Sequence, residues 1–165
     1  MTALTFTQQD MHGQILNIVR EMYQTGFKPD YIVGIAPDGI VPAVMLGKYL
    51  EIPLNTLHVE VKSNDGCETN LWMAEDAAGI DCPLKQILVL NNVNYSGATF
   101  DWIKRDWNSS IGDDQRDSIW HNNVKFAALV HNEYSILQSD FAGVTVSLDP
   151  IDRYTFEFPI NNWWK

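Results

Sequence analysis

The sequence predicts a single α/β domain whose central parallel sheet is flanked by helices. Short apolar segments rich in β-branched residues alternate with longer segments of helical periodicity. This alternation is typical of a parallel sheet with helices on both faces. The chain has 165 residues, about the length of one ordinary domain. No repeat or linker-like segment divides it, so we treat 1–165 as one domain.

Helix and strand signals follow one another along the chain. The first helix has its apolar residues at helical spacing, and Thr7 and Asp10 are placed as in a capping box. Gly26 is a natural stop for it. The elements expected in order are a helix over Thr7–Tyr23, a buried strand over Tyr31–Ala36, a helix over Val41–Leu50, a strand over Leu54–Val61, an irregular segment over Lys62–Pro83, a strand over Gln86–Leu90, a helix from Ser96 to about Trp107, an ambiguous segment over Gly112–His121, a strand over Val124–Val130, and shorter strands over Val144–Leu148 and Tyr154–Phe158.

The net charge of −10 argues against several classes of partner. Duplex nucleic acid requires a basic face, and an anionic membrane surface would also be repelled. No apolar run approaches the roughly 20 residues needed to span a bilayer. The first residues have neither the basic start nor the long apolar stretch of a secretory signal. We therefore expect a cytoplasmic protein that binds neither nucleic acid nor membranes.

Two turns are candidates for a ligand site. In parallel sheets ligands bind beyond the carboxyl ends of the strands, where the strand order reverses. The turns Ala36–Ile40 and Asn91–Thr99 each follow a buried strand. If those strands are neighbours, both turns line one crevice.

The segment Tyr95–Thr99 carries the strongest chemical signal. Gly97 permits a tight turn with exposed backbone N–H groups, and Ser96 and Thr99 add hydroxyl donors. The positive end of a helix follows, so the segment could hold a phosphate without a lysine. The alternative is an ordinary strand-to-helix turn with Ser96 as the N-cap.

Longer stretches resemble a known family. Ile87–Thr99 resembles the phosphoribosyl-pyrophosphate (PRPP) signature of the type I phosphoribosyltransferases. Tyr31–Ala43 resembles the family's first strand and pyrophosphate loop. Arg153–Pro159 resembles the C-terminal hood of the purine-using members.

The resemblance implies a fold and a reaction. The fold is a Rossmann-type parallel sheet with a small hood, formed here mainly by about 149–165. The reaction transfers ribose 5-phosphate from PRPP to a purine-like base, with Mg²⁺ as the cofactor. The loop Lys62–Gly79 would close over the site, and a homodimer is expected.

The resemblance also assigns residues to roles. The 5-phosphate would be held by Tyr95, Ser96, Gly97, Ala98 and Thr99; the pyrophosphate loop would be Ala36, Pro37, Asp38 and Gly39; the catalytic positions would be Asn91, Asn92 and Tyr95; the base would meet His131, Asn132, Tyr154 and Phe156; and any metal would be held indirectly through Asn91 and Asn92.

The departures from the family pattern are concentrated in the chemistry. Asn91 and Asn92 replace paired acids, and an amide cannot supply negative charge to Mg²⁺ or to a ribosyl cation. Tyr95 replaces an acid and is a poor general base at neutral pH. Pro37 replaces a basic residue, and Asp38 places a carboxylate where pyrophosphate would sit.

The lysine that purine-using members place after the fourth strand aligns with Asn132, next to His131. Either side chain could still donate to a base carbonyl.

Three functions remain open from the sequence. The first is a divergent phosphoribosyltransferase whose catalysis is weakened at Asn91 and Asn92. The second is a non-catalytic sensor or regulatory protein that binds PRPP or a nucleoside monophosphate. The third is a structural or partner-binding domain that has kept only the fold. The fold alone does not choose among them.

Overall fold

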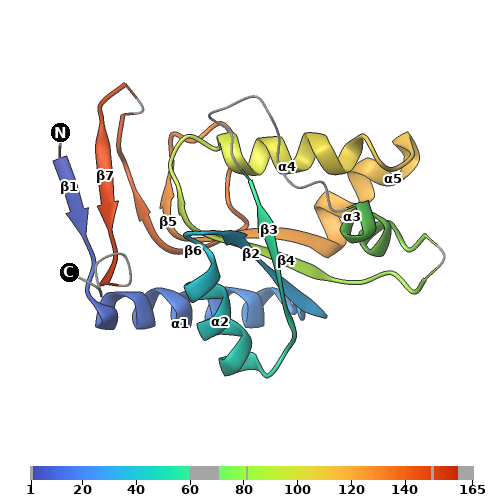
Figure 1. Cartoon of the computed structure of the whole chain (residues 1–165), viewed down its shortest axis with the longest axis horizontal. Coiled ribbons are helices and arrows are strands. Elements are labelled where there is room, and N and C mark those ends of the chain that lie inside the picture. The colour runs from blue at the N-terminus through green and yellow to red at the C-terminus, as the bar shows by residue number, and fades with distance from the viewer. Residues whose placement is uncertain (1, 60–70, 81, 150, 160–165) are drawn as a thin grey trace.

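The computed structural model describes residues 2–59, 71–80, 82–149 and 151–159. Its centre is a five-stranded parallel sheet in the order β3-β2-β4-β5-β6 (Figure 1). The strands are β2 (Tyr31–Ala36), β3 (Leu54–His58), β4 (Ile87–Asn94), β5 (Val124–Asn132) and β6 (Phe141–Val146). The parallel α/β fold expected from the sequence is confirmed.

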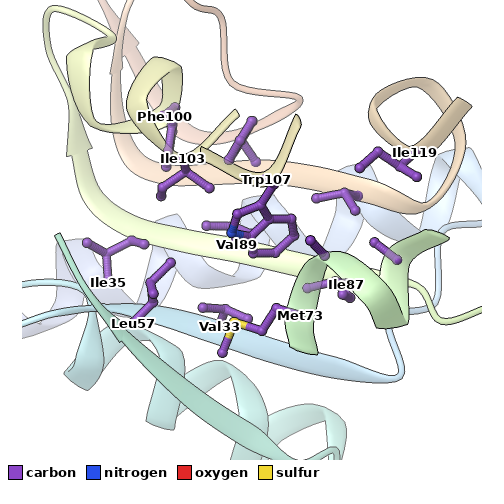
Figure 2. Packing of buried hydrophobic residues seen from close by; sticks show 14 of the residues in the cluster. Val33, Ile35, Leu57, Met73, Ile87, Val89, Phe100, Ile103, Trp107 and Ile119 are labelled. Atoms are coloured by element: carbon purple, nitrogen blue, oxygen red, sulfur yellow. The ribbon is translucent and has the colours of Figure 1, made fainter. Parts of the chain in front are cut away.

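Helices cover both faces of this sheet (Figure 1). The helices are α1 (Gln8–Thr25) and α2 (Ile40–Leu50) on one face, α3 (Leu71–Ala78) and α4 (Ala98–Asn108) on the other, and α5 (Asp113–Ser118) with the π-helix Ile119–Asn123 before β5. In Figure 2, Trp107 and Met73 point from α4 and α3 toward the strands that carry Val89 and Val33. All four side chains are 0–1% exposed, so the sheet is buried on this face too.

Helix α1 begins and ends where the local chemistry predicts. The Thr7 side chain accepts from the Asp10 backbone N–H, and the Asp10 carboxylate accepts from that of Thr7. The capping box is therefore present. Gly26 ends the helix at φ 73°, in the left-handed region that glycine enters without strain.

The hood is built from both ends of the described chain. Strand β1 (Thr2–Thr5) pairs in parallel with β7 (Tyr154–Glu157) in a separate two-stranded sheet (Figure 1). Phe6 and Phe158 follow these strands and stack with ring centroids 5.0 Å apart. Strand β1 was not expected from the sequence.

The segment Lys62–Pro83 was expected to be irregular, but Leu71–Ala78 forms helix α3. Its residues Met73, Ala74 and Ala77 are buried at the i, i+1, i+4 spacing of one helical face, which accounts for the helix. Residues 60–70 and 81 lie outside the described residues. The expected lid at Lys62–Gly79 therefore falls partly on α3 and partly outside the described chain.

Two strands run further than expected, and both extensions bear on the site. Strand β4 continues to Asn94 and β5 to Asn132, because the two strands stay paired beyond Leu90: Asn91 lies opposite Ala128, Val93 opposite Val130 and Asn94 opposite His131. Strand β6 begins at Phe141 rather than at Val144.

Candidate functional site

A pocket of about 340 Å³ lies beyond the carboxyl ends of β2 and β4. It is lined by Asp38, the run Asn91–Phe100, and Tyr154 and Phe156 of the hood. Because β2 and β4 are neighbours, residues from both predicted turns meet in one crevice. Of the predicted pyrophosphate loop, Asp38 lines the pocket, whereas Ala36, Pro37 and Gly39 are not part of its lining.

The turn between β4 and α4 favours glycine at position 97. Gly97 has φ 88°, and a Cβ atom there would lie 2.6 Å from the backbone N of Leu137. Gly97 is itself the N-cap of α4, so the expected alternative with Ser96 as the cap is wrong.

Ser96 instead stabilises the turn internally. Its Oγ accepts from the backbone N–H of Ala98 (3.2 Å), and its carbonyl oxygen accepts from the N–H of Ile136 (2.9 Å). An accepting hydroxyl still has its own proton to donate. The exposed Ser96 hydroxyl, the half-buried Thr99 and the first N–H groups of α4 therefore form a site suited to an anion.

Asn91 and Asn92 lie within the last four residues of β4 rather than after the strand. The two side chains point to opposite sides of the strand, yet both line the pocket. Asn91 Oδ1 accepts from the backbone N–H of Asn92 (2.9 Å). The pair is neutral, so it offers hydrogen bonds to hydroxyl groups but no charge.

A buried polar network supports the turn from behind. Asn94 is 4% exposed, and its Nδ2 donates to the carbonyl of Leu137 (2.8 Å) and to Ser139 Oγ (3.0 Å). It also approaches His131 Nδ1 (3.3 Å), while His131 Nε2 meets Gln138 Oε1 (2.8 Å). In this arrangement the imidazole accepts at Nδ1 and donates from Nε2. The network ties the end of β4 to the segment after β5.

Asn132 fixes the backbone of the turn. It is fully buried; its Nδ2 donates to the carbonyls of Tyr95 (3.1 Å) and Leu148 (2.8 Å), and its Oδ1 accepts from the N–H of Leu148 (2.9 Å). Neither His131 nor Asn132 is among the described lining residues of the pocket. Their expected donation to a base stays a prediction, but β5 is longer than expected and these polar atoms already have protein partners.

Tyr95 connects the turn to the hood. Its hydroxyl lies 2.6 Å from the carbonyl oxygen of Asp152 and 3.0 Å from that of Asp149. Its ring centroid is 6.2 Å from that of Tyr154 and 5.8 Å from that of Phe156. Desolvation, and then the neighbouring Tyr154 and acidic groups, raise the pKa of Tyr95 above its usual value. Tyr95 is therefore a still poorer general base than an ordinary tyrosine.

The pocket carries little charge. Among the described residues that line it, Asp38 alone has an ionisable carboxylate or a cationic group. Asp38 is exposed two positions before α2 begins, where an acid also suits the positive end of the helix. The peptide bond Ala36–Pro37 is cis. A Cβ atom at Gly39 would lie 2.6 Å from the Leu90 carbonyl oxygen, so this turn lies directly against β4.

The sequence pointed to most of the polar residues that line the pocket, but it missed part of the polar network around the turn. The residues that it missed are Asn94, Gln138 and Ser139. One signal could have revealed Asn94: it follows Asn92 at the period-two spacing of one strand face. Gln138 and Ser139 belong to an irregular segment, and nothing local marks them.

Comparison with known proteins identifies the fold. No family model and no curated protein sequence matches the chain. Among solved structures, a purine phosphoribosyltransferase from Pyrococcus horikoshii is similar, with 20% identity, a TM-score of 0.64, and coverage of 96% of this chain and 94% of that one. Xanthine-guanine-hypoxanthine phosphoribosyltransferase from Helicobacter pylori is similar at 13% identity and TM-score 0.65, covering 93% and 91%.

A third similar structure is a hypothetical protein from Neisseria gonorrhoeae with bound ppGpp. It has 19% identity, a TM-score of 0.68, and coverage of 98% of this chain and 90% of that one. The chain therefore has the fold of the type I phosphoribosyltransferases, as its sequence motifs indicated. At these identities the likeness establishes the fold alone.

Proposed function

We propose that this chain binds a ligand with a 5-phosphorylated ribose, either PRPP or a nucleoside monophosphate, and that it binds better than it catalyses. The observation that carries the proposal is the Gly97 turn, which opens the N-terminus of α4 and two hydroxyl groups into a pocket. The ppGpp bound by the Neisseria gonorrhoeae protein supports a phosphorylated nucleotide as the ligand class.

The hood supplies the other half of the proposed site. Tyr154 and Phe156 lie on alternate positions of β7 and line the same pocket as the turn. Aromatic side chains offer flat apolar surface on which a nucleobase can stack. We propose that a purine-like base stacks on this aromatic wall, formed by Tyr154 and Phe156.

The neutral pair at Asn91 and Asn92 is the reason to place binding above catalysis. A charge-stabilising group is commonly worth about 3 kcal/mol at the transition state, roughly two orders of magnitude in rate. Asparagine can hold ribose hydroxyls in the ground state but gives no charge to a developing cation. Tyr95 adds no base, because its hydroxyl faces two carbonyl oxygens.

Transfer of ribose 5-phosphate to a purine is the second candidate function. The two similar purine phosphoribosyltransferases favour it. In this reaction the C1–pyrophosphate bond breaks, a bond from C1 to the base nitrogen forms, and the base loses a proton. The residues described here would position the ribose through Asn91 and Asn92 and the phosphate through Ser96 and Thr99.

The residues of this site suit Mg²⁺ only when it binds together with a phosphorylated ligand. Within the described residues, no group of three or more His, Cys, Asp or Glu side chains is arranged to hold a metal ion. The lining offers one carboxylate, Asp38, and the amide oxygens of Asn91 and Asn92. Mg²⁺ is often held by one or two carboxylates together with ligand phosphates, so we propose that Mg²⁺ enters with PRPP, whose diphosphate it would neutralise.

Calorimetric titration tests the binding proposal. We expect the native chain to bind ribose 5-phosphate but not ribose, and GMP more tightly than guanosine. Thr99→Val, which removes one hydroxyl of the turn, should weaken both phosphorylated ligands about tenfold. Thr145→Val, at an exposed position of β6, is the matched control and should bind as the native chain does. Equal binding of phosphorylated and unphosphorylated ligands would reject the proposal.

A turnover assay separates the two candidate functions. PRPP, Mg²⁺ and radiolabelled purines should give little nucleotide with the native chain and more after Asn91→Asp plus Asn92→Asp. Rapid turnover by the native chain would favour the transferase. Binding of ribose 5-phosphate and GMP is compatible with either result.

One further finding and one further expectation concern features outside the candidate site. No helix in the described part of the chain is both long and apolar enough to cross a bilayer. The expected homodimer concerns a second copy of the chain and stays a prediction, which sedimentation velocity would test.

A further inference from the structure

We propose that the Tyr95 hydroxyl is a positioning group that holds one end of the hood, where β1 and β7 start, over the pocket. The role differs from the catalytic one expected for this position, because Tyr95 acts on the ligand through Tyr154 and Phe156. It rests on the proposed function insofar as these aromatic residues meet the base.

The hood has little support of its own. Strands β1 and β7 form a two-stranded sheet that pairs with no other described strand. A two-stranded sheet by itself is marginally stable in water. The hood therefore depends on side-chain contacts with the main domain to keep its place.

Those contacts lie at opposite ends of the hood. At the end where β1 and β7 finish, Phe158 is 1% exposed and stacks on Phe6 within the core on the α1 face. At the end where they start, Thr2 pairs with Tyr154, and the Tyr154 ring contacts Tyr95. The start of the hood thus contacts the turn between β4 and α4.

The Tyr95 hydroxyl makes the polar part of this second contact. It faces the carbonyl oxygens of Asp152, at 2.6 Å, and Asp149, at 3.0 Å, on the connection that leads into β7. Asn132 holds the Tyr95 carbonyl and both polar backbone groups of Leu148 on the same connection. The backbone of Tyr95 is therefore held from β5, and its hydroxyl in turn holds the segment just before Tyr154.

Because the hood is attached at both ends, removing the Tyr95 hydroxyl should loosen only the end where β7 starts. Removing only the hydroxyl leaves the ring and its contacts with Tyr154 and Phe156, so the turn and the core stay intact. The start of β7 then loses its polar tether, and the aromatic wall is less well placed. Contacts to the base should weaken while contacts to the 5-phosphate persist.

Hydrogen exchange of the ligand-free protein tests the tether directly. In Tyr95→Phe, the amides of β7 should exchange about tenfold faster, as expected for the loss of one hydrogen bond. The amides of β5 should be unchanged. Tyr134→Phe, at a residue 58% exposed after β5, is the control and should alter neither strand. Unchanged exchange of β7 in Tyr95→Phe would overturn the proposal.

Binding then tests the consequence for the ligand. For Tyr95→Phe we expect GMP to bind about tenfold more weakly and ribose 5-phosphate to bind within twofold of the native chain. An equal loss for both ligands would mean that Tyr95 merely maintains the turn, which overturns the positioning role. If the native chain binds neither ligand, the proposed function is wrong, and the exchange of β7 alone decides whether Tyr95 holds the hood.

Discussion

Asp38 is the residue whose charge most affects the ligand. It is an exposed carboxylate in a pocket that has no cationic side chain among its described lining residues. A phosphorylated ligand there meets a like charge that water screens only in part. If the pocket binds a phosphorylated ligand as proposed, we expect Asp38 to disfavour ligands with several phosphates unless a cation accompanies them.

Neutralising this residue gives a first prediction. Asp38→Asn should bind PRPP about threefold more tightly in the absence of Mg²⁺, and the gain should shrink at high salt. Calorimetry at two ionic strengths measures both effects. Asp117→Asn removes the same charge from the exposed face of α5 and should change nothing. Weaker binding by Asp38→Asn in the presence of Mg²⁺ would instead identify Asp38 as a metal ligand.

Gly97 is the residue on which the turn depends, and it gives a second prediction. Gly97→Ala should lower the free energy of unfolding by about 1–3 kcal/mol, since alanine at φ 88° is strained and its Cβ meets the Leu137 backbone. Urea unfolding measures the loss, and ribose 5-phosphate binding should disappear. Gly13→Ala, with nothing within 4 Å of the added Cβ, should instead stabilise α1 by about 0.5–1 kcal/mol. Comparable losses in the two variants would argue against a special role for the turn.

At the scale of single residues, sequence reasoning succeeds where the chemistry is local. Ser96, Gly97 and Thr99 could be placed in the turn before α4 because a turn and a helix start are encoded within a few positions. His131 and Asn132 were expected to face a base, but they lie on the last two positions of β5 and are buried. Strand ends depend on pairing with distant segments, which local patterns do not show.

Helix α3 shows the same limit at the scale of elements. It lies in a polar stretch and has only eight residues, so its periodicity is weak. Packing reveals it: Met73 is fully buried between α3 and the sheet (Figure 2). Strand β1 is harder still, because its partner β7 lies at the other end of the chain.

Burial of Met73 gives a third prediction. Met73→Ala should lower the free energy of unfolding by about 2–5 kcal/mol, because a fully buried side chain leaves a cavity. Ile151→Ala, at a residue 88% exposed, should stay within about 0.5 kcal/mol of the native chain. Urea unfolding of both variants makes the comparison. Two equally small losses would mean that α3 is not part of the core.

The parallel fold was predictable as a whole because several signals agreed. Apolar strands, helical segments between them and candidate ligand-binding turns at the strand ends all pointed to one architecture. The order of the strands then places the turns after β2 and β4 side by side. The function is less determined, since the same fold can keep a phosphate site while losing catalytic charge.

Stability at alkaline pH reports on a buried contact between layers. Tyr31 is 5% exposed, and its hydroxyl donates to Asp76 of α3 (2.9 Å). Burial first, and then the hydrogen bond to Asp76, raise the pKa of Tyr31 well above its ordinary value of 10.0. The folded chain holds this proton more tightly than the unfolded chain, so the stabilisation is complete below pH 10 and is lost as the pH rises above it.

The raised pKa of Tyr31 gives a fourth prediction. Tyr31→Phe should be about 1 kcal/mol less stable than the native chain at neutral pH, because Asp76 loses its donor. Between pH 7 and about 11, the difference between the two free energies of unfolding should stay constant up to about pH 10 and shrink above it. Urea unfolding across this range measures the difference, with Tyr23→Phe, at a residue 86% exposed, as the control. A difference that is independent of pH would exclude Tyr31 as the titrating group.

We propose above all that the turn between β4 and α4 holds a 5-phosphate. The most direct test is a titration of the ¹⁵N-labelled chain with ribose 5-phosphate, followed by amide chemical shifts. We predict that the largest saturable shifts are those of Gly97, Ala98 and Thr99, and that inorganic phosphate at higher concentration moves the same amides. Saturable shifts elsewhere in the chain with these three amides unmoved, or no shifts at all, would show that the turn does not bind the 5-phosphate.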